Sequence, residues 1–129
     1  MTDRLDTVDD THAALADRFF GAVAAGDMDT VRDIYTEDAQ IWHNFDNAVQ
    51  TRDENLQLLS YVSTNWKNFR FEDVRRTPIE GGFVQQHVMC GEGPDDQPFE
   101  SPSILVVSVA DGQVTRIQEY FDPGQVPLP

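Results

Sequence analysis

The sequence predicts an α+β fold in which three N-terminal helices pack on a curved, mostly antiparallel β-sheet. Residues up to about Trp66 place apolar side chains mainly at helical spacing. From Phe69 to Phe121 the chain changes to four strand-like runs separated by turn residues. Helices that precede the strands, instead of alternating with them, are typical of α+β domains.

The first helix is predicted over residues 7–25, and a second, shorter helix follows it. One stripe of the first helix consists of Val8, His12, Leu15, Phe19 and Val23. Gly26 ends this helix, and Asp27 is a suitable N-cap for the second. The buried side of the second helix is predicted to consist of Val31, Ile34 and Tyr35.

An early strand and a third helix complete the N-terminal half. Residues 39–45 alternate as a strand, with Ile41 and His43 on one face and Trp42 on the other. Thr51 and Glu54 have the spacing of a capping box at the start of the third helix. The apolar face of that helix is predicted to consist of Leu56, Leu59, Val62 and Trp66.

The four later strands are predicted over residues 69–77, 83–90, 103–110 and 114–121. Gly81 and Gly82 provide the first turn, and Asp111 with Gly112 provides the tightest hairpin turn. No linker or repeat divides the chain, so residues 1–129 are interpreted as one domain with a core over about residues 7–122. The proline-containing tail, residues 123–129, is expected to be an arm or a loose end.

Charge and composition exclude several classes of function. A net charge of −14 repels phosphate backbones and anionic lipid, so neither nucleic acid nor a membrane surface is an expected partner. The longest apolar run, residues 104–107, is too short to span a bilayer. The single Cys90 cannot form an intrachain disulfide, and the first residues lack the features of a secretory signal. These observations predict a reduced, cytoplasmic protein.

Polar side chains interrupt the apolar strands and are the first candidates for a functional site. The most prominent are His43, Gln85, His87 and Glu119. A buried polar group without a partner costs about 1 to 3 kcal/mol, so these residues face either water or a cavity. Glu119 shares a strand face with Ile117 and Phe121, which places it on the inner side. Parity alone does not decide which face of residues 83–90 points inward.

The opposite face of the sheet predicts a homodimer. If Ile41 and His43 point inward, Trp42 lies on the outer face, where it needs cover from a partner chain. Tyr120 and Val114 are assigned to the same outer face by their parity with Arg116 and Gln118.

Three segments resemble the nuclear-transport-factor-2-like superfamily, in its SnoaL-like and ketosteroid-isomerase-like branch. These are the helical pair that ends in AAGDMDTVRDIYTEDAQIW, the capping box before the third helix, and the closing DGQVTRIQEYFD. The resemblance as a whole covers about residues 7–122. The resemblance implies a cone-shaped α+β barrel of the cystatin-like type, with an apolar pocket that carries acid and base groups. It also implies a homodimer formed through the outer face of the sheet.

Residue by residue, the resemblance to the known enzymes of this superfamily is incomplete. The catalytic aspartate of the ketosteroid isomerases falls on His43, and their oxyanion-hole tyrosine falls on Phe19. Their second donor falls in residues 104–106, where this chain has no acid. The catalytic aspartate of the limonene-epoxide hydrolases falls on Glu119. Their arginine and second aspartate would lie near residues 85–89, where this chain has Gln85 and His87 instead.

Three hypotheses of function follow. The first is a ketosteroid-isomerase-like or polyketide-cyclase-like enzyme that uses His43 and Glu119 as acid and base on a small hydrophobic molecule, without an organic cofactor. Its reaction would be of the isomerase, cyclase, dehydratase or epoxide-hydrolase type. Its substrate-binding residues are predicted to be Phe19, Ile41, Leu59, Trp66, Phe83, Gln85 and His87. The second is a catalytically silent ligand-binding or dimerisation module. The third, a metal site formed by His43, His87 and Glu119, lacks a spacing signature, so no metal is assigned.

Overall fold

A computed structural model describes the backbone from Thr2 to Pro129 and the side chains from His12 onward. Val8, which the sequence places on the first helix, is therefore outside the described side chains. The elements, in chain order, are α1 (Thr2–Ala25), α2 (Met28–Ile34), β1 (Tyr35–His43), β2 (Val49–Thr51), α3 (Arg52–Asn65), β3 (Lys67–Ile79), β4 (Gly82–Glu92), β5 (Pro98–Ala110), β6 (Gln113–Tyr120) and the short 3₁₀ helix η1 (Pro123–Gln125).

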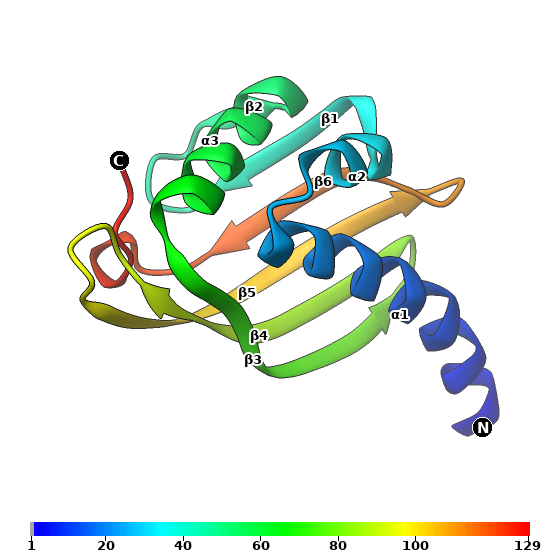
Figure 1. The fold of residues 1–129 in the computed structure, drawn as a ribbon. Helices are drawn as coiled ribbons and strands as arrows, with labels where there is room; N and C mark the ends of the chain where they lie inside the picture. The colour runs from blue at the N-terminus through cyan, green and yellow to red at the C-terminus, as the bar shows by residue number, and fades with distance from the viewer. Residues whose placement is uncertain (1) are drawn as a thin grey trace.

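The six strands form one curved sheet in the order β2-β1-β6-β5-β4-β3. Every neighbouring pair is antiparallel except β1 and β6, which are parallel. The three helices lie on the same face of the sheet (Figure 1). The predicted α+β class is therefore confirmed, although the sheet is open and does not close into a barrel because β2 and β3 remain as edges.

The helix boundaries follow the local signals in the sequence. α1 ends before Gly26, whose φ of 74° favours glycine. Asp27 caps α2 by accepting a hydrogen bond from the Thr30 amide at 3.2 Å. Both hydrogen bonds of the Thr51 and Glu54 capping box are present at the start of α3: each backbone amide donates to the side-chain oxygen of the other residue. These predicted features are confirmed.

The strand boundaries differ from the prediction most at β1, β2 and β5. β5 begins at Pro98 and not at residue 103, so it pairs with the whole length of β4. β1 begins at Tyr35 and not at residue 39, so Tyr35 belongs to a strand and not to the second helix. β2, which the sequence analysis missed, is only three residues long and pairs with β1 at the edge of the sheet. Both residues of the Asp111–Gly112 turn have positive φ values, 53° and 76°, as the tightest hairpin turns require.

The predicted position of Val114 on the outer face of the sheet is wrong. It is 1% exposed and lies in the core with Ile34 and Tyr35. The pairing of β5 with β6 shifts register between Ser108 and Val109, which reverses the inward and outward alternation at this end of β6. Simple parity along β6 therefore fails at its first residues.

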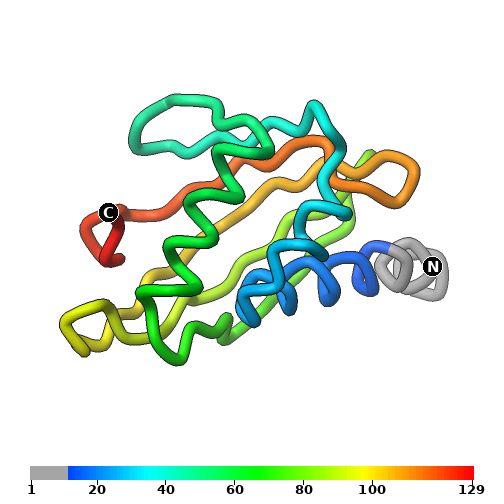
Figure 2. The backbone as a smooth tube through the Cα atoms, turned by 45° about the horizontal axis from the view of Figure 1, so that its top comes forward, coloured from blue at the N-terminus to red at the C-terminus, as the bar shows by residue number. Residues whose placement is uncertain are grey.

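The C-terminal tail packs on the domain and is not a loose end. Val126 is 8% exposed and lies in a cluster with Val62, Trp66 and Met89. The Trp66 indole donates a hydrogen bond to the Pro127 carbonyl at 3.0 Å. The backbone view shows the tail beside the end of β6 (Figure 2).

No helix among residues 2–129 is long and apolar enough to cross a membrane.

Candidate functional site

His43 and Glu119 are brought together by the one parallel strand pair in the described sheet. His43 is the last residue of β1, and the register of β1 with β6 places it opposite Glu119. The His43 Nε2 atom lies 3.2 Å from Glu119 Oε1. The side chains are 5% and 16% exposed, so the pair is largely removed from water. The rings of Phe45 and Phe121 pack against His43.

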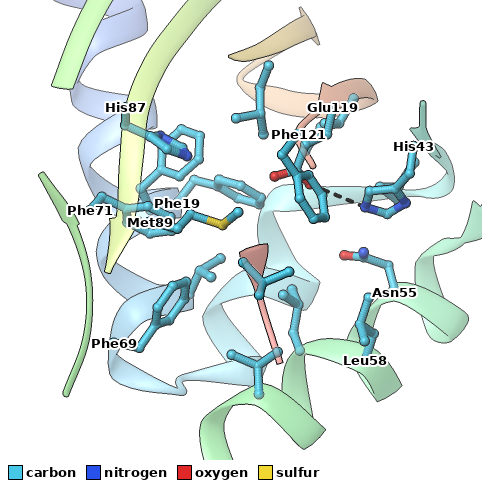
Figure 3. A pocket seen from close by; sticks show the side chains of 18 of the residues that line it. Phe19, His43, Asn55, Leu58, Phe69, Phe71, His87, Met89, Glu119 and Phe121 are labelled. Carbon is cyan, nitrogen blue, oxygen red and sulfur yellow. Dashed lines mark ion pairs between the residues drawn. The ribbon is translucent and has the colours of Figure 1, made fainter. Parts of the chain in front are cut away.

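The pair lies on the wall of a cavity of about 90 Å³ between the helices and the sheet (Figure 3). α1, α3, the strands and the C-terminal tail all contribute to the wall. Most of the lining is aromatic or aliphatic. The lining side chains that can ionise or form hydrogen bonds are Tyr35, His43, Asn55, Trp66, His87 and Glu119. The cavity therefore presents a few polar groups within an apolar enclosure, as small-molecule sites usually do.

Seven of the nine residues predicted for the site line this cavity. They are Phe19, Ile41, His43, Leu59, Trp66, His87 and Glu119. Phe83 and Gln85 do not line it. Both are buried, at 1% and 0% exposed, so they lie on the inward face of β4, as a residue that contacts a ligand in the cavity would have to.

The position along β4 explains why Phe83 and Gln85 lie outside the cavity. Phe83, Gln85, His87 and Met89 all point inward from β4, but only His87 and Met89 reach the lining. Phe83 is near the beginning of β4, where its ring approaches His12 of α1 at 6.1 Å between centroids. Alternation along the strand identifies the residues that point inward. Which of these residues border the cavity depends on where α1 and α3 lie.

Gln85 nevertheless connects to the cavity through His87. Arg76 on β3 donates from Nε to Gln85 Oε1 at 2.6 Å, and its Nη1 donates to Asp17 of α1 at 2.7 Å. Gln85 Nε2 lies 2.9 Å from His87 Nδ1. Because arginine only donates, the oxygen of Gln85 must face Arg76 and its NH₂ group must face His87.

This arrangement determines the tautomer of His87. The NH₂ group of Gln85 donates, so His87 Nδ1 must accept. A neutral imidazole carries one proton, which is then on Nε2. The Nε2 atom is buried and has no hydrogen-bond partner among the described residues.

Burial also keeps His87 neutral. Removal from water lowers the pKa of His87 to about 4, the Arg76 charge contributes in the same direction, and the Glu119 carboxylate opposes both. The rings of Phe20 and Phe71 pack against the imidazole, with centroids at 5.6 and 4.6 Å. At neutral pH His87 is therefore an uncharged hydrogen-bond donor.

A second buried polar chain lies at the α3 side of the cavity. The Tyr35 hydroxyl donates to Asn55 Oδ1 at 2.8 Å, and Asn55 Nδ2 donates to Gln50 Oε1 at 3.0 Å. Burial raises the pKa of Tyr35 well above its ordinary value, and the negative charge of Glu119 adds to this effect. Tyr35 therefore remains protonated under ordinary conditions.

Tyr35 and Asn55 are polar residues of the wall that were not predicted from the sequence. Asn55, Leu59, Val62 and Trp66 follow each other at intervals of four, three and four residues, which places them on one side of α3. That spacing is a signal that could have identified Asn55 beside the predicted Leu59. Tyr35 had no such signal because it was assigned to the preceding helix.

The positions that the resemblance assigns to the oxyanion donors of the ketosteroid isomerases are apolar in this chain. Phe19, at the position assigned to the tyrosine, packs its ring against Phe20 and Tyr35. Leu105 lines the cavity where the second donor would be expected. Among the described residues, no group of three His, Cys, Asp or Glu side chains is arranged to hold a metal ion. His43, Glu119 and His87 are the carboxylate and imidazole groups that line this cavity.

Solved structures with the same fold come from several organisms. One is a hypothetical protein with a ketosteroid isomerase-like fold from Catenulispora acidiphila, in complex with trimethylamine, at 14% identity and a TM-score of 0.76, covering 89% of this chain and 93% of that chain. Another is a candidate polyketide cyclase from Xanthomonas campestris, at 19% identity and a TM-score of 0.77, with the same two coverages. A third is an LEH-like epoxide hydrolase from M. tuberculosis, at 17% identity and a TM-score of 0.73, covering 89% and 85%.

These structural similarities establish the fold. A search of curated proteins finds no match. The family model described as the SnoaL-like domain matches residues 16–117, which include α2, α3, β1 to β5, the C-terminal part of α1 and most of β6. The chain therefore belongs to the SnoaL-like domain family.

Proposed function

We propose that this protein is an enzyme that binds a small hydrophobic molecule in the cavity and transfers a proton on it, with Glu119 as base and His43 as its acid partner. The observation that carries this proposal is the 3.2 Å approach of His43 Nε2 to Glu119 Oε1 on the wall of an otherwise largely apolar cavity. General acid and base groups must lie within hydrogen-bond reach of the proton that they move, and both groups border the same space.

The proposed reaction requires no organic cofactor. Glu119 removes a proton from the bound molecule, and the Nε2–H group of His43 donates a proton to the atom of that molecule that gains negative charge. Transfer of the proton from Glu119 to His43 Nε2, across 3.2 Å, then restores both groups. Exclusion of water by the aromatic wall strengthens both interactions. Isomerisation, aldol-type cyclisation, dehydration and epoxide opening all use such a pair. The fold similarity to a candidate polyketide cyclase and to an LEH-like epoxide hydrolase is consistent with this range.

The size of the cavity guides the choice of test substrates. A volume of about 90 Å³ suits a five-membered ring better than a multi-ring compound. We would assay 3-cyclopentenone, whose isomerisation to the conjugated ketone is a proton transfer that absorbance follows. Cyclopentene oxide, whose hydrolysis gives a diol, tests epoxide opening. Both are compared with the uncatalysed rates in the same buffer.

Two variants test the roles of the pair. Glu119→Gln preserves the shape of the side chain and removes the base, so it is expected to abolish turnover and to leave ligand binding largely intact. His43→Ala is expected to impair both turnover and binding because it also removes a ring from the wall. Full activity in Glu119→Gln would contradict the assignment. Binding without turnover in the wild type, with either substrate, would favour the silent ligand-binding module.

We also infer a homodimer that forms through the outer face of the sheet. The rings of Trp42 and Tyr120 meet edge to face on this side of the sheet, with 5.2 Å between their centroids, and Tyr120 is 41% exposed. Ile104 pairs with Tyr120 across β5 and β6, and both Ile104 and Val106 are half-buried on the side away from the helices. Gln118 lies between Trp42 and Val106 in the strand register, and the apolar side chains around it favour contact with a second copy.

A further inference from the structure

The unpaired Nε2 atom of His87 is an unusual feature of the cavity wall. His87 is 3% exposed, its ring lines the cavity, and its Nε2 atom is buried with no partner among the described residues. Buried polar atoms are paired in the great majority of cases, and an unpaired donor costs about 1 to 3 kcal/mol. An unpaired donor beside a cavity suggests that a ligand supplies the missing acceptor.

We propose that His87 Nε2 donates a hydrogen bond to a neutral oxygen of the bound ligand, and that Asp17, Arg76 and Gln85 are positioning residues that maintain this donor. The proposal rests on the cavity being the ligand site of the proposed function. It adds a second polar contact on a different strand from the His43 and Glu119 pair. In the view of Figure 3, Glu119 lies between His43 and His87.

The hydrogen bonds from Asp17 through Arg76 and Gln85 to His87, which we call the positioning chain, run from the surface to the cavity through α1, β3 and β4. Asp17 of α1 is 72% exposed in its side chain and contacts Arg76 of β3, whose side chain is only 18% exposed. Arg76 determines the orientation of the Gln85 amide, and Gln85 determines which imidazole nitrogen of His87 carries the proton. Each contact excludes the alternative orientation of the next group, so the Nε2–H donor is fixed before any ligand binds.

The chemistry of this donor specifies the type of acceptor. A neutral N–H group pairs with a carbonyl oxygen or an ether oxygen without requiring a charge on the ligand. The neighbouring Glu119 carboxylate disfavours an anionic ligand group at the same position. A carbonyl group and a strained ether such as an epoxide share the required acceptor oxygen, and separate probes distinguish them.

Three five-membered rings of nearly equal size provide the test. Cyclopentanone carries a carbonyl oxygen, tetrahydrofuran carries an ether oxygen, and cyclopentane carries neither. Binding of each is measured by NMR titration of the wild type and of His87→Phe, which keeps an aromatic ring between Phe20 and Phe71 and removes the donor. We expect at least one of the two oxygen-bearing rings to bind about five- to tenfold more tightly than cyclopentane to the wild type, and to lose this advantage in His87→Phe. Cyclopentane binding should be nearly equal in the two proteins.

A spectroscopic measurement tests the positioning chain independently of binding. Long-range ¹H–¹⁵N spectra of the wild type at pH 7 should show His87 neutral with its proton on Nε2. In Gln85→Glu, the new carboxylate accepts from both Arg76 and His87, so the proton should move to Nδ1 and the preference for oxygen-bearing rings should disappear. If the wild type carries the proton on Nδ1, the positioning chain is wrong.

The outcomes separate this proposal from the proposed function. Equal binding of all three rings to the wild type, or an oxygen preference that persists in His87→Phe, would overturn the role of His87 even if Glu119-dependent turnover is observed. Conversely, an oxygen preference that depends on His87 would support the donor even if neither cyclopentene oxide nor 3-cyclopentenone reacts.

Discussion

Tyr35 and Asn55 link the first strand to the third helix through a buried hydrogen bond of 2.8 Å. Tyr35 is the first residue of β1, and Asn55 lies near the beginning of α3. The two residues are 2% and 4% exposed. This contact holds α3 against the sheet at one end of the cavity, so its loss should affect the stability of the whole domain.

Tyr35→Phe is expected to lower the free energy of unfolding by about 1 to 3 kcal/mol, because it leaves the Asn55 carbonyl oxygen without its donor in a buried position. Urea denaturation followed by circular dichroism measures this change. Tyr61→Phe is the matched control, since the Tyr61 hydroxyl forms no hydrogen bond among the described residues and its side chain is half-buried. Equal effects of the two substitutions would argue against a special role for the Tyr35–Asn55 contact.

Removal of residues 126–129 is expected to destabilise the protein by about 3 kcal/mol. The truncation exposes the surface buried by Val126, which is worth about 1.5 to 3 kcal/mol, and removes the acceptor of the Trp66 indole. It should also open the cavity, because Val126 and Leu128 line it. Thermal denaturation measures the loss of stability, and a red shift of the tryptophan fluorescence reports the exposure of Trp66. Removal of the exposed Pro129 alone should change neither signal.

The sequence predicts most of the fold because its signals are local. The capping residues Asp27 and Thr51 fix the starts of two helices, and Asp111 with Gly112 fixes the tightest hairpin. The missed strand β2 has only three residues, which is too short for alternation to be visible. The parallel pairing of β1 with β6 joins segments that are far apart in the sequence, so no local signal specifies it.

Seven of the nine predicted site residues line the cavity, but the contacts that connect them were not predictable. Parity placed His43 and Glu119 on inward faces, but their common register comes from the pairing of β1 with β6. The hydrogen bonds from Asp17 through Arg76 to Gln85 join three elements whose relative placement is set by packing. The burial of Val114 was not predictable from alternation, because a register shift changes the parity of its strand.

His87 should make the protein less stable as the pH falls. Its pKa is lowered from 6.5 to about 4 in the folded protein, so between these values the unfolded chain binds a proton that the folded chain does not. The contribution of neutral His87 to the free energy of unfolding is fully present above about pH 6.5. It decreases as the pH falls below this value and is lost when the pH passes through about 4. The shift corresponds to about 3 kcal/mol.

Urea denaturation at several pH values measures this contribution. Between pH 6.5 and 4 the wild type should lose about 3 kcal/mol more than His87→Phe, which has no imidazole to protonate. Carboxylates titrate in the same range in both proteins, so only the difference between the two is interpreted. Parallel stability curves for the two proteins would show that the pKa of His87 is not lowered on folding.

The final prediction concerns assembly through the outer face of the sheet. Tyr120→Lys places a charge in the apolar patch formed with Trp42, Ile104 and Val106, so we expect it to convert a dimer into a 14.6 kDa monomer. Ile79→Lys is the matched control, because Ile79 is similarly exposed, at 39%, but lies at the end of the edge strand β3. It should leave the dimer intact.

Salt provides a second readout of the same interface. Each copy carries a net charge of −14, so the two copies repel each other at low ionic strength. An interface held by apolar side chains should therefore strengthen as added salt screens this repulsion, whereas one held by ion pairs should weaken. Sedimentation velocity at tens of micromolar protein, in low and in moderate salt, measures both effects. A wild type that sediments only as a 14.6 kDa species in both conditions would refute the dimer, and an equal response of the two lysine variants would place the interface elsewhere.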